Sequence, residues 1–392
     1  MMRGVPDYRM SSRLHNVLIA GMGVGMVVFL TGLFIDPARA WGNYLIALFY
    51  LLSLGVGAAS FIALQSASNA GFGVAYRRIP EAVTRVIPVA GVGAIVLFFG
   101  IDALYEWSHA SVVAEDPILQ GKQAYLNVPF FILRIFVYFA IWVWLSHLLV
   151  TNSREQDRDP DLIYTRRNVR NGVLFILLGG LAFIFASIDL LMSLEPHWYS
   201  TVFGLMTIAG MFLCGLAGVT IVMIILRHNG FGSVFTTKHL SGMGKWMLAM
   251  SVFWVYLWVS QHLLIWYSNI PEETSYYVFR HFDSWGSLSF LNLILNWLIP
   301  FLVLLPQATK RDDTTMLYVS VVILLGHWLD LYIRVMPTIF GENPLFGLPE
   351  LGSYTGMMAL FFWVTLRSFS RYNPVPLNDP YLVESLPAVG RV

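Results

Sequence analysis

Residues 173–193 read VLFILLGGLAFIFASIDLLMS, a stretch of 21 residues in which Asp189 is the only charged side chain. A helix needs about 20 mostly apolar residues to cross the roughly 30 Å hydrocarbon core of a bilayer. The stretch is too long for a barrel strand, and lipid offers no hydrogen-bond partner to an open backbone. It therefore predicts a transmembrane helix.

Comparable apolar stretches recur along the whole chain, and they predict an all-α integral membrane protein of about ten transmembrane helices. The expected spans are Val17 to Ile35, Asn43 to Gln65, Val86 to Trp107, Val128 to Val150, Val173 to Ser193, Trp198 to Leu226, Trp246 to Tyr267, Leu288 to Leu305, Met316 to Met336 and Leu351 to Phe369. No linker interrupts them, so we expect a single polytopic domain over residues 1–392. The polar start lacks a small-residue cleavage pattern, and we expect no removable signal peptide.

Composition supports the same class. Hydrophobic residues make up 57% of the 392 and charged residues only 12%, whereas an ordinary soluble domain carries about 25% charged residues. We expect no nucleic-acid partner. A lone cysteine, Cys214, excludes disulfides within the chain, iron-sulfur clusters and thiolate zinc sites, so we expect no metal site and no redox centre of its own.

Basic residues predict the orientation, because short loops rich in Lys and Arg stay in the cytoplasm. With the N-terminus inside, only Arg39, Lys122 and Arg280 fall in outer loops. The nineteen on the inner side are Arg3, Arg9, Arg13, Arg77, Arg78, Arg85, Arg154, Arg158, Arg166, Arg167, Arg170, Arg227, Lys238, Lys245, Lys310, Arg311, Arg367, Arg371 and Arg391. Both termini are therefore expected in the cytoplasm, and the proline-bearing tail 371–392 is expected either to be disordered or to lie extended over a partner.

Charged groups inside the hydrocarbon cost several kcal/mol unless they are paired or hydrated, so each marks a candidate site. The third predicted helix ends with Asp102, Tyr105, Glu106 and His109, whose spacing of i, i+3, i+4 and i+7 predicts one shared helical face. All four are candidates for a proton pathway or a quinone site.

The ninth predicted helix carries a similar stripe. His327, Asp330 and Arg334 follow at i, i+3 and i+7, and Asp330 can pair with Arg334 one turn away. The remaining candidates come from other helices and from one outer turn: Arg134, Tyr138, Asp189, Glu195, His197, Gln261 and His262. The orientation places six of the charged and histidine side chains in the outer half of the membrane: Asp102, Arg134, Asp189, His262, Asp330 and Arg334. Apart from His147, no ionisable residue is expected in the inner half.

Two interpretations of these residues stay open. Asp102 or Asp189 with Arg134, and Asp330 with Arg334, can be buried staples that fix helix packing. Alternatively, the charged residues meet His and Tyr at one depth to move protons. We predict an outward proton opening at Asp189, Glu195 and His197. A haem held by His262 and His327 is the less favoured assignment.

Three segments resemble a known family: SIDLLMSLEPHWYSTVFG (187–204), SQHLLIWYSNIPEET (260–274) and HWLDLYIRVMP (327–337). Together they are similar to the second large membrane subunit of alternative complex III, a bacterial quinol:cytochrome c oxidoreductase. That subunit belongs to the polysulfide-reductase-like, NrfD-like membrane family. The resemblance covers essentially the whole chain.

The resemblance implies two four-helix bundles, about 43–194 and 198–336, with the first and tenth helices outside them. It also implies the bacterial inner membrane and, as partners, a paralogous NrfD-like membrane subunit, an iron-sulfur subunit, haem c subunits and small membrane subunits. Haem c and iron-sulfur clusters would then belong to those partners, with quinone as a possible ligand of this chain.

The expected function is that of a membrane subunit of a quinol-oxidising electron-transfer complex, which contributes scaffold, a proton pathway and possible quinone contact. One alternative is that this subunit itself oxidises quinol, with Asp102 or His262 accepting a proton and Arg134 or Tyr138 orienting the ring oxygen. The other alternative is a free-standing secondary transporter, for which we expect broken helices and inverted repeats.

Overall fold

The computed structural model describes residues 8–282 and 284–386, and within these ranges it contains helices and no strands. Arg3 and Arg391 of the topology count, and the last six residues of the tail, lie outside the described residues. Among the described residues, nine helices are long and apolar enough to cross a membrane: Ser12–Ile35, Pro37–Ala67, Arg78–Leu104, Val128–Glu155, Ile163–Leu194, Thr201–Phe231, Thr237–Ser268, Gly286–Leu304 and Asp313–Val335. The all-α membrane fold expected from the sequence is confirmed.

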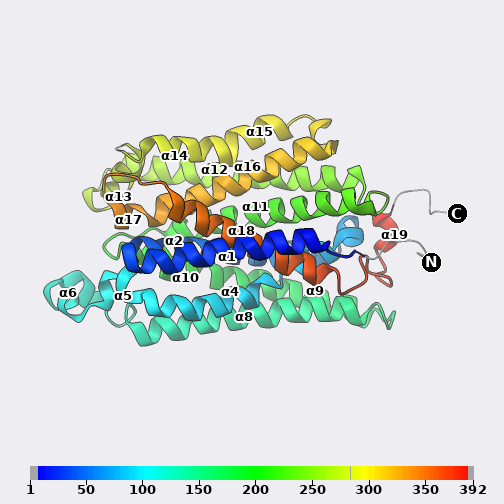
Figure 1. The fold of residues 1–392 in the computed structure, drawn as a ribbon, viewed down its shortest axis with the longest axis horizontal. Coiled ribbons are helices and arrows are strands. Elements are labelled where there is room, and N and C mark those ends of the chain that lie inside the picture. The colour runs from blue at the N-terminus through cyan, green and yellow to red at the C-terminus, as the bar shows by residue number, and fades with distance from the viewer. Residues whose placement is uncertain (1–7, 283, 387–392) are drawn as a thin grey trace.

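The tenth predicted span is also a helix, α18 (Leu348–Phe369). It is less apolar than the other nine, and it runs beside α1 (Ser12–Ile35) (Figure 1). Figure 1 shows α1 beginning and α18 ending at the same end of the molecule. A chain that starts and finishes its spans at the same end must cross an even number of times, so α18 is the tenth span.

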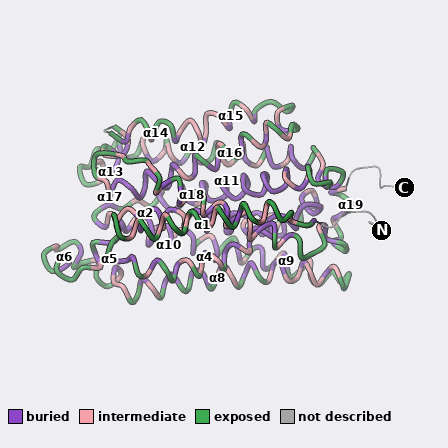
Figure 2. Tube along the Cα trace, in the orientation of Figure 1, coloured by how far each residue is buried: buried purple, intermediate pink, exposed green. Residues whose placement is uncertain are grey.

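Two helices form the centre of the molecule, α2 (Pro37–Ala67) and α11 (Thr201–Leu226). Both are buried along nearly their whole length (Figure 2). They touch through glycines: a Cβ atom on Gly57 would lie 2.9 Å from the Gly215 Cα and 2.5 Å from the Met211 carbonyl oxygen. Small residues allow helix backbones to approach closely in a membrane, where lipid removes the hydrophobic drive to associate.

The other spans pack around these two helices. On one side α2 contacts α4 (Val86–Leu97) and α9 (Ile163–Leu174), and α9 contacts α8 (Val128–Glu155). On the other side α11 contacts α12 (Thr237–Ser268) and α16 (Asp313–Val335). The span formed by α14 (Gly286–Leu293) and α15 (Ile299–Leu304) packs against α16 and α12. α10 (Gly180–Leu190) bridges the two groups through its contact with α11.

Several spans depart from regular α-helix. The third combines α3 (Arg78–Val83), α4, a 3-10 turn at Phe98–Gly100 and the short α5 (Ile101–Leu104). Single π-helical turns occur at Phe175–Gly179, between α9 and α10, and at Ile294–Leu298, between α14 and α15. Such turns leave backbone carbonyls without their usual partner and occur often at functional sites.

Short helices close the two ends of the bundle. The end with the connections between α4 and α8 carries α6 (Ala110–Glu115) and α7 (Pro117–Lys122), and α13 (Pro271–His281) and α17 (Pro337–Phe340) lie at the same end (Figure 1). The opposite end carries α19 (Leu382–Ser385) against a 3-10 turn at Gly71–Tyr76.

The tail corrects an expectation. Instead of being disordered or lying over a partner, its described part packs on this chain. Asp379 forms an ion pair with the buried Arg77, and the Leu377 amide donates to Asp157 Oδ1 at 2.9 Å. The Ser385 hydroxyl donates to the Phe72 carbonyl oxygen at 2.8 Å. Composition suggested disorder because it could not reveal these partners, which come from loops far away in the sequence.

Candidate functional site

The prediction that Asp102, Tyr105, Glu106 and His109 share one helical face is wrong. The helix stops at Leu104 and Tyr105 is extended, with φ −118° and ψ 112°, so the helical spacing no longer applies. Tyr105 is fully buried and donates to the Leu190 carbonyl oxygen at 3.0 Å. The side chains of Asp102, Glu106 and His109 are exposed. The structure does not bring these four residues to one site.

The first polar cluster joins α8 to α10. Arg134 donates from Nε and Nη2 to the two carboxylate oxygens of Asp189, at 2.8 and 3.0 Å. Tyr138 donates to Asp189 Oδ2 at 2.8 Å, and the Arg134 guanidinium lies over the Tyr125 ring, 3.8 Å from its centroid. Asp189 is fully buried and Arg134 is 7% exposed. The carboxylate therefore receives three hydrogen bonds, as a buried charge requires.

The structure therefore settles which carboxylate pairs with Arg134: it is Asp189, and Asp102 lies elsewhere. The geometry is that of a packed, fully bonded pair, the arrangement expected of a staple between two helices. Glu195 and His197 do not share the cluster. Glu195 forms an ion pair with Arg280, and His197 Nε2 lies 2.5 Å from Asp116 Oδ2.

The second cluster lies on α16 and its neighbours. Arg334 Nη2 is 2.8 Å from Asp330 Oδ2, so the predicted ion pair is present, although the contact is not aligned as a hydrogen bond. Arg334 Nη1 donates to Thr207 of α11 at 2.9 Å. Asn292 of α14 donates to Asp330 Oδ1 at 3.0 Å. Three helices thus meet at one buried ion pair.

A polar column continues from this carboxylate towards the middle of the span. Asn296 lies in the π-helical turn at Ile294–Leu298 and donates to Asn292 Oδ1 at 2.6 Å. Its carbonyl oxygen, displaced by that turn, accepts from the Ser251 hydroxyl at 2.6 Å. His327 lies one turn before Asp330 on α16, is 2% exposed, and packs against Tyr50 with ring centroids 5.3 Å apart.

A cavity of about 30 Å³ opens at the second cluster. Asp330, Arg334, Asn292, Arg280 and His281 line it together with the aromatic residues Phe203, Trp258, Tyr276 and Tyr277. In the described part of the chain, the Arg334 Nε and His281 Nδ1 atoms are buried without a hydrogen-bond partner. A polar cavity needs about 10 to 15 Å³ to hold one water, so this one has room for one or two.

Two histidines pack together next to the cavity, and His281 lines it. His262 of α12 and His281 of α13 have ring centroids 4.4 Å apart, and His262 lies 3.8 Å from the Trp258 ring. Burial, with the neighbouring His262 and the charges of Arg280 and Arg334, lowers the pKa of His281 to about 3. His281 is thus neutral at physiological pH and offers one donor and one acceptor.

Gln261 and His262 are adjacent in sequence, but their side chains contact different residues. Gln261 Oε1 accepts from Ser200, at the start of α11, at 3.0 Å. The aromatic neighbours of His262 are Trp258, Tyr277 and His281, whereas His327 packs on Tyr50. These separate neighbourhoods give no support to a haem held between His262 and His327.

Sequence reasoning missed four residues of the second cluster: Asn292, Asn296, Arg280 and His281. Asn292 and Asn296 carry no charge, but their i, i+4 spacing in an otherwise apolar span is a signal that could have found them. The basic-residue pattern places Arg280 in an outer loop and does not mark it as a site residue. Only tertiary packing shows that Arg280, near the end of α13, is 1% exposed.

The two carboxylates occupy similar sequence positions. A common pattern surrounds them: an apolar residue, Asp and Leu follow one another, and a proline comes seven residues after the Asp. The two segments are IDLLMSLEP (188–196) and LDLYIRVMP (329–337). In both segments the helix ends before the proline: α10 ends at Leu190 and α16 at Val335. The two clusters are therefore counterparts, one closed by bonds and the other open to a cavity.

A scan of protein-family models and a search of curated proteins both return no match to this chain.

Proposed function

We propose that this chain is a proton-conducting and scaffolding membrane subunit of a quinol-oxidising electron-transfer complex. The observation that carries the proposal is the Asp330 cluster. The buried Asp330 carboxylate, Arg334 and the Asn292 amide line a cavity with room for water. Among the described residues, Arg334 Nε and His281 Nδ1 are buried there without a hydrogen-bond partner. A buried carboxylate next to water can take up and release a proton, whereas a purely structural pair is normally fully bonded.

The path runs outward from the middle of the membrane. His327 and Asn296 lie at its inner end, Asp330 and the cavity follow, and Arg280 with Glu195 forms its outer mouth. Glu195 is part of the predicted outward opening, but it serves this second cluster through Arg280. From the basic-residue bias we expect this mouth on the outer side of the membrane. In the complex that the chain resembles, this would be the periplasmic side of the bacterial inner membrane.

The first cluster has the other role. The Asp189 carboxylate accepts hydrogen bonds from Arg134 and Tyr138, and none of these three residues lines the cavity at Asp330. We assign it to the scaffold, where it holds α8 against α10.

Cavity size favours proton conduction over quinol oxidation at the Asp330 cluster. One or two waters fill about 30 Å³, while pockets for small organic ligands measure about 300 to 1,000 Å³. Any quinone contact of this chain would then lie elsewhere, and the paralogous membrane subunit is the better candidate for quinol oxidation.

Membership in such a complex rests on the three sequence segments that resemble alternative complex III. Two of them supply the counterpart carboxylates Asp189 and Asp330, so the resemblance falls on the residues that the fold buries at its polar clusters. Partner subunits would hold the haem c and iron-sulfur groups.

The role of Asp330 can be tested in the intact complex reconstituted into vesicles. Asp330→Asn keeps the shape and removes the charge, so we expect quinol oxidation to continue with less coupled proton release, read with an internal pH dye. Asp189→Asn is the matched control, because it should lower thermal stability and leave the proton-to-electron ratio unchanged. An unchanged ratio in Asp330→Asn contradicts the proposed pathway.

Membership is tested separately by purification in mild detergent. A subunit of this kind should co-purify with c-type haem absorbance and with an iron-sulfur protein. A free-standing transporter would elute without haem absorbance, and that result would reject the complex while leaving the measurement on Asp330 meaningful.

A further inference from the structure

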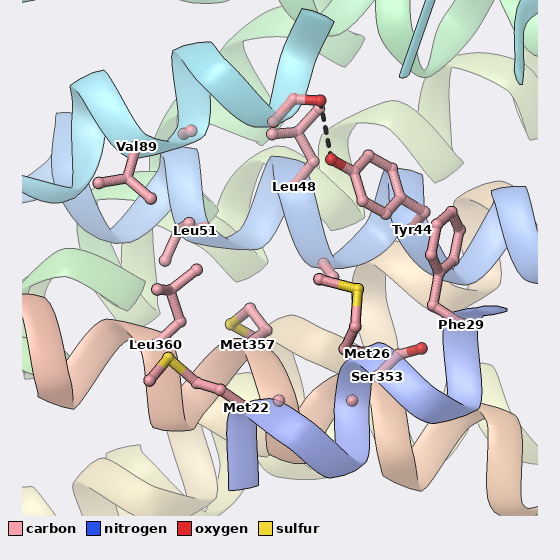
Figure 3. Close-up of a pocket in the computed structure, with 15 residues that line it drawn as sticks. Met22, Met26, Phe29, Tyr44, Leu48, Leu51, Val89, Ser353, Met357 and Leu360 are labelled. Carbon is pink, nitrogen blue, oxygen red and sulfur yellow. Dashed lines mark hydrogen bonds between the residues drawn. The ribbon is translucent and has the colours of Figure 1, made fainter. Parts of the chain in front are cut away.

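A second cavity, distinct from the polar clusters, lies between the peripheral helices and the central body. It measures about 280 Å³, and residues of α1, α2, α4 and α18 line it (Figure 3). All four helices belong to the ten spans, so the cavity lies at membrane depth, where its surroundings are hydrocarbon.

The cavity exists because α1 is attached to the protein mainly through α18. A Cβ atom on Gly25 would lie 2.6 Å from the Gly356 Cα, and one on Gly21 would lie 2.9 Å from the Ala359 Cβ. This small-residue contact draws α1 tightly onto α18. The described glycines of α1 make no such contact with α4. Val89 (Figure 3) and Gly93 line the cavity on that side.

The lining is apolar and adaptable. Met22, Met26 and Met357 contribute flexible side chains, and Leu51 and Leu360 close the inner part. Methionine fills irregular spaces and adjusts to different apolar shapes.

Two hydroxyl groups also lie among the lining residues. The Tyr44 hydroxyl is already used, because it donates to the Gly93 carbonyl oxygen at 2.8 Å (Figure 3). Ser353 provides the other. No charged residue is among those that line this part of the described chain.

We propose that this cavity binds one acyl chain of a membrane lipid, which joins α1 and α18 to the central body. An apolar cavity excludes water and takes an apolar occupant, and here the hydrocarbon of the bilayer is the adjacent medium. A transmembrane helix of a partner is about 10 Å wide and needs a longer groove than these fifteen lining residues provide.

An isoprenoid quinone fits less well than an acyl chain. Its ring carries two carbonyl groups that need hydrogen-bond donors, whereas of the two lining hydroxyls the Tyr44 hydroxyl already donates to Gly93 and leaves Ser353 as the remaining side-chain donor. The arginines of the two polar clusters, Arg134 and Arg334, come from α8 and α16, which do not line the cavity.

The test uses phosphatidylglycerol with a photoreactive diazirine in one acyl chain, exchanged into the purified full-length protein and mapped by peptide mass spectrometry. We expect adducts concentrated on the segments around Met26 and Met357. Met26→Trp should fill the cavity and abolish them. Val27→Trp is the matched control, since Met26 and Val27 are neighbours with 59% and 61% exposure and only Met26 lines the cavity.

Equal labelling of both variants, or adducts spread evenly over exposed residues such as Leu133 of α8, would overturn the proposal. So would competition by an isoprenoid quinone but not by unlabelled phosphatidylglycerol. If Met26→Trp fails to elute as a folded protein, Ala47→Leu on α2 fills the same cavity from the opposite wall and gives the same reading.

Discussion

Asp330 and Arg334 should depend on each other energetically. Asp330→Leu leaves a buried arginine that cannot lose its charge, and among the described residues its remaining partners are Thr207 and the Phe203 ring. Arg334→Leu leaves a carboxylate with one bond from Asn292. Each single change should cost about 3 to 5 kcal/mol, whereas the double change to leucine should be close to neutral.

This double-mutant cycle therefore predicts a coupling energy of about 6 kcal/mol or more between Asp330 and Arg334. The two singles should also differ with pH: an aspartate can take up a proton and become neutral, so acid should partly restore Arg334→Leu, while Asp330→Leu stays impaired.

The free energy of unfolding is measured by titrating the purified protein with sodium dodecyl sulfate in mixed micelles. The matched control is the same cycle at Arg158 and Glu155, an exposed pair 3.5 Å apart, where we expect coupling below about 1 kcal/mol. If the Asp330 and Arg334 changes add within about 0.5 kcal/mol, the two residues act independently and the reasoning fails.

Three further predictions concern the ends of the bundle. Asp379→Asn should destabilise the protein by about 3 to 5 kcal/mol because it leaves Arg77 buried without its ion pair, and faster proteolysis of the tail would report the loss. An impermeant maleimide should label a cysteine at the exposed Glu115 in intact spheroplasts and spare one at the exposed Arg158, and the reverse pattern would invert the orientation. Because the pKa of His281 is lowered, the unfolded chain binds a proton on this side chain below about pH 6.5, whereas the folded protein binds it only near pH 3. The free energy of unfolding should therefore fall as the pH decreases from about 6.5 to about 3, and His281→Gln should remove this part of the pH dependence.

The sequence determined the fold class and the even number of crossings, because these depend on local properties of each segment. A run such as residues 173–193 must become a helix wherever lipid surrounds it. The Asp330 and Arg334 pair was also predictable, since both residues lie on one helix whose period fixes their separation.

Tertiary structure decided what depends on residues far apart in the chain. Spacing alone could not tell whether Asp102 or Asp189 pairs with Arg134, and it failed at Tyr105, where the helix ends earlier than its apolar pattern suggests. The composition of the tail suggested disorder, because the residues that hold it, Arg77 and Asp157, are far away in the sequence and meet it only in the folded protein. Periodicity describes one helix at a time, whereas the cavity at Asp330 is the space left between several helices after their side chains pack, and only the assembled bundle defines it.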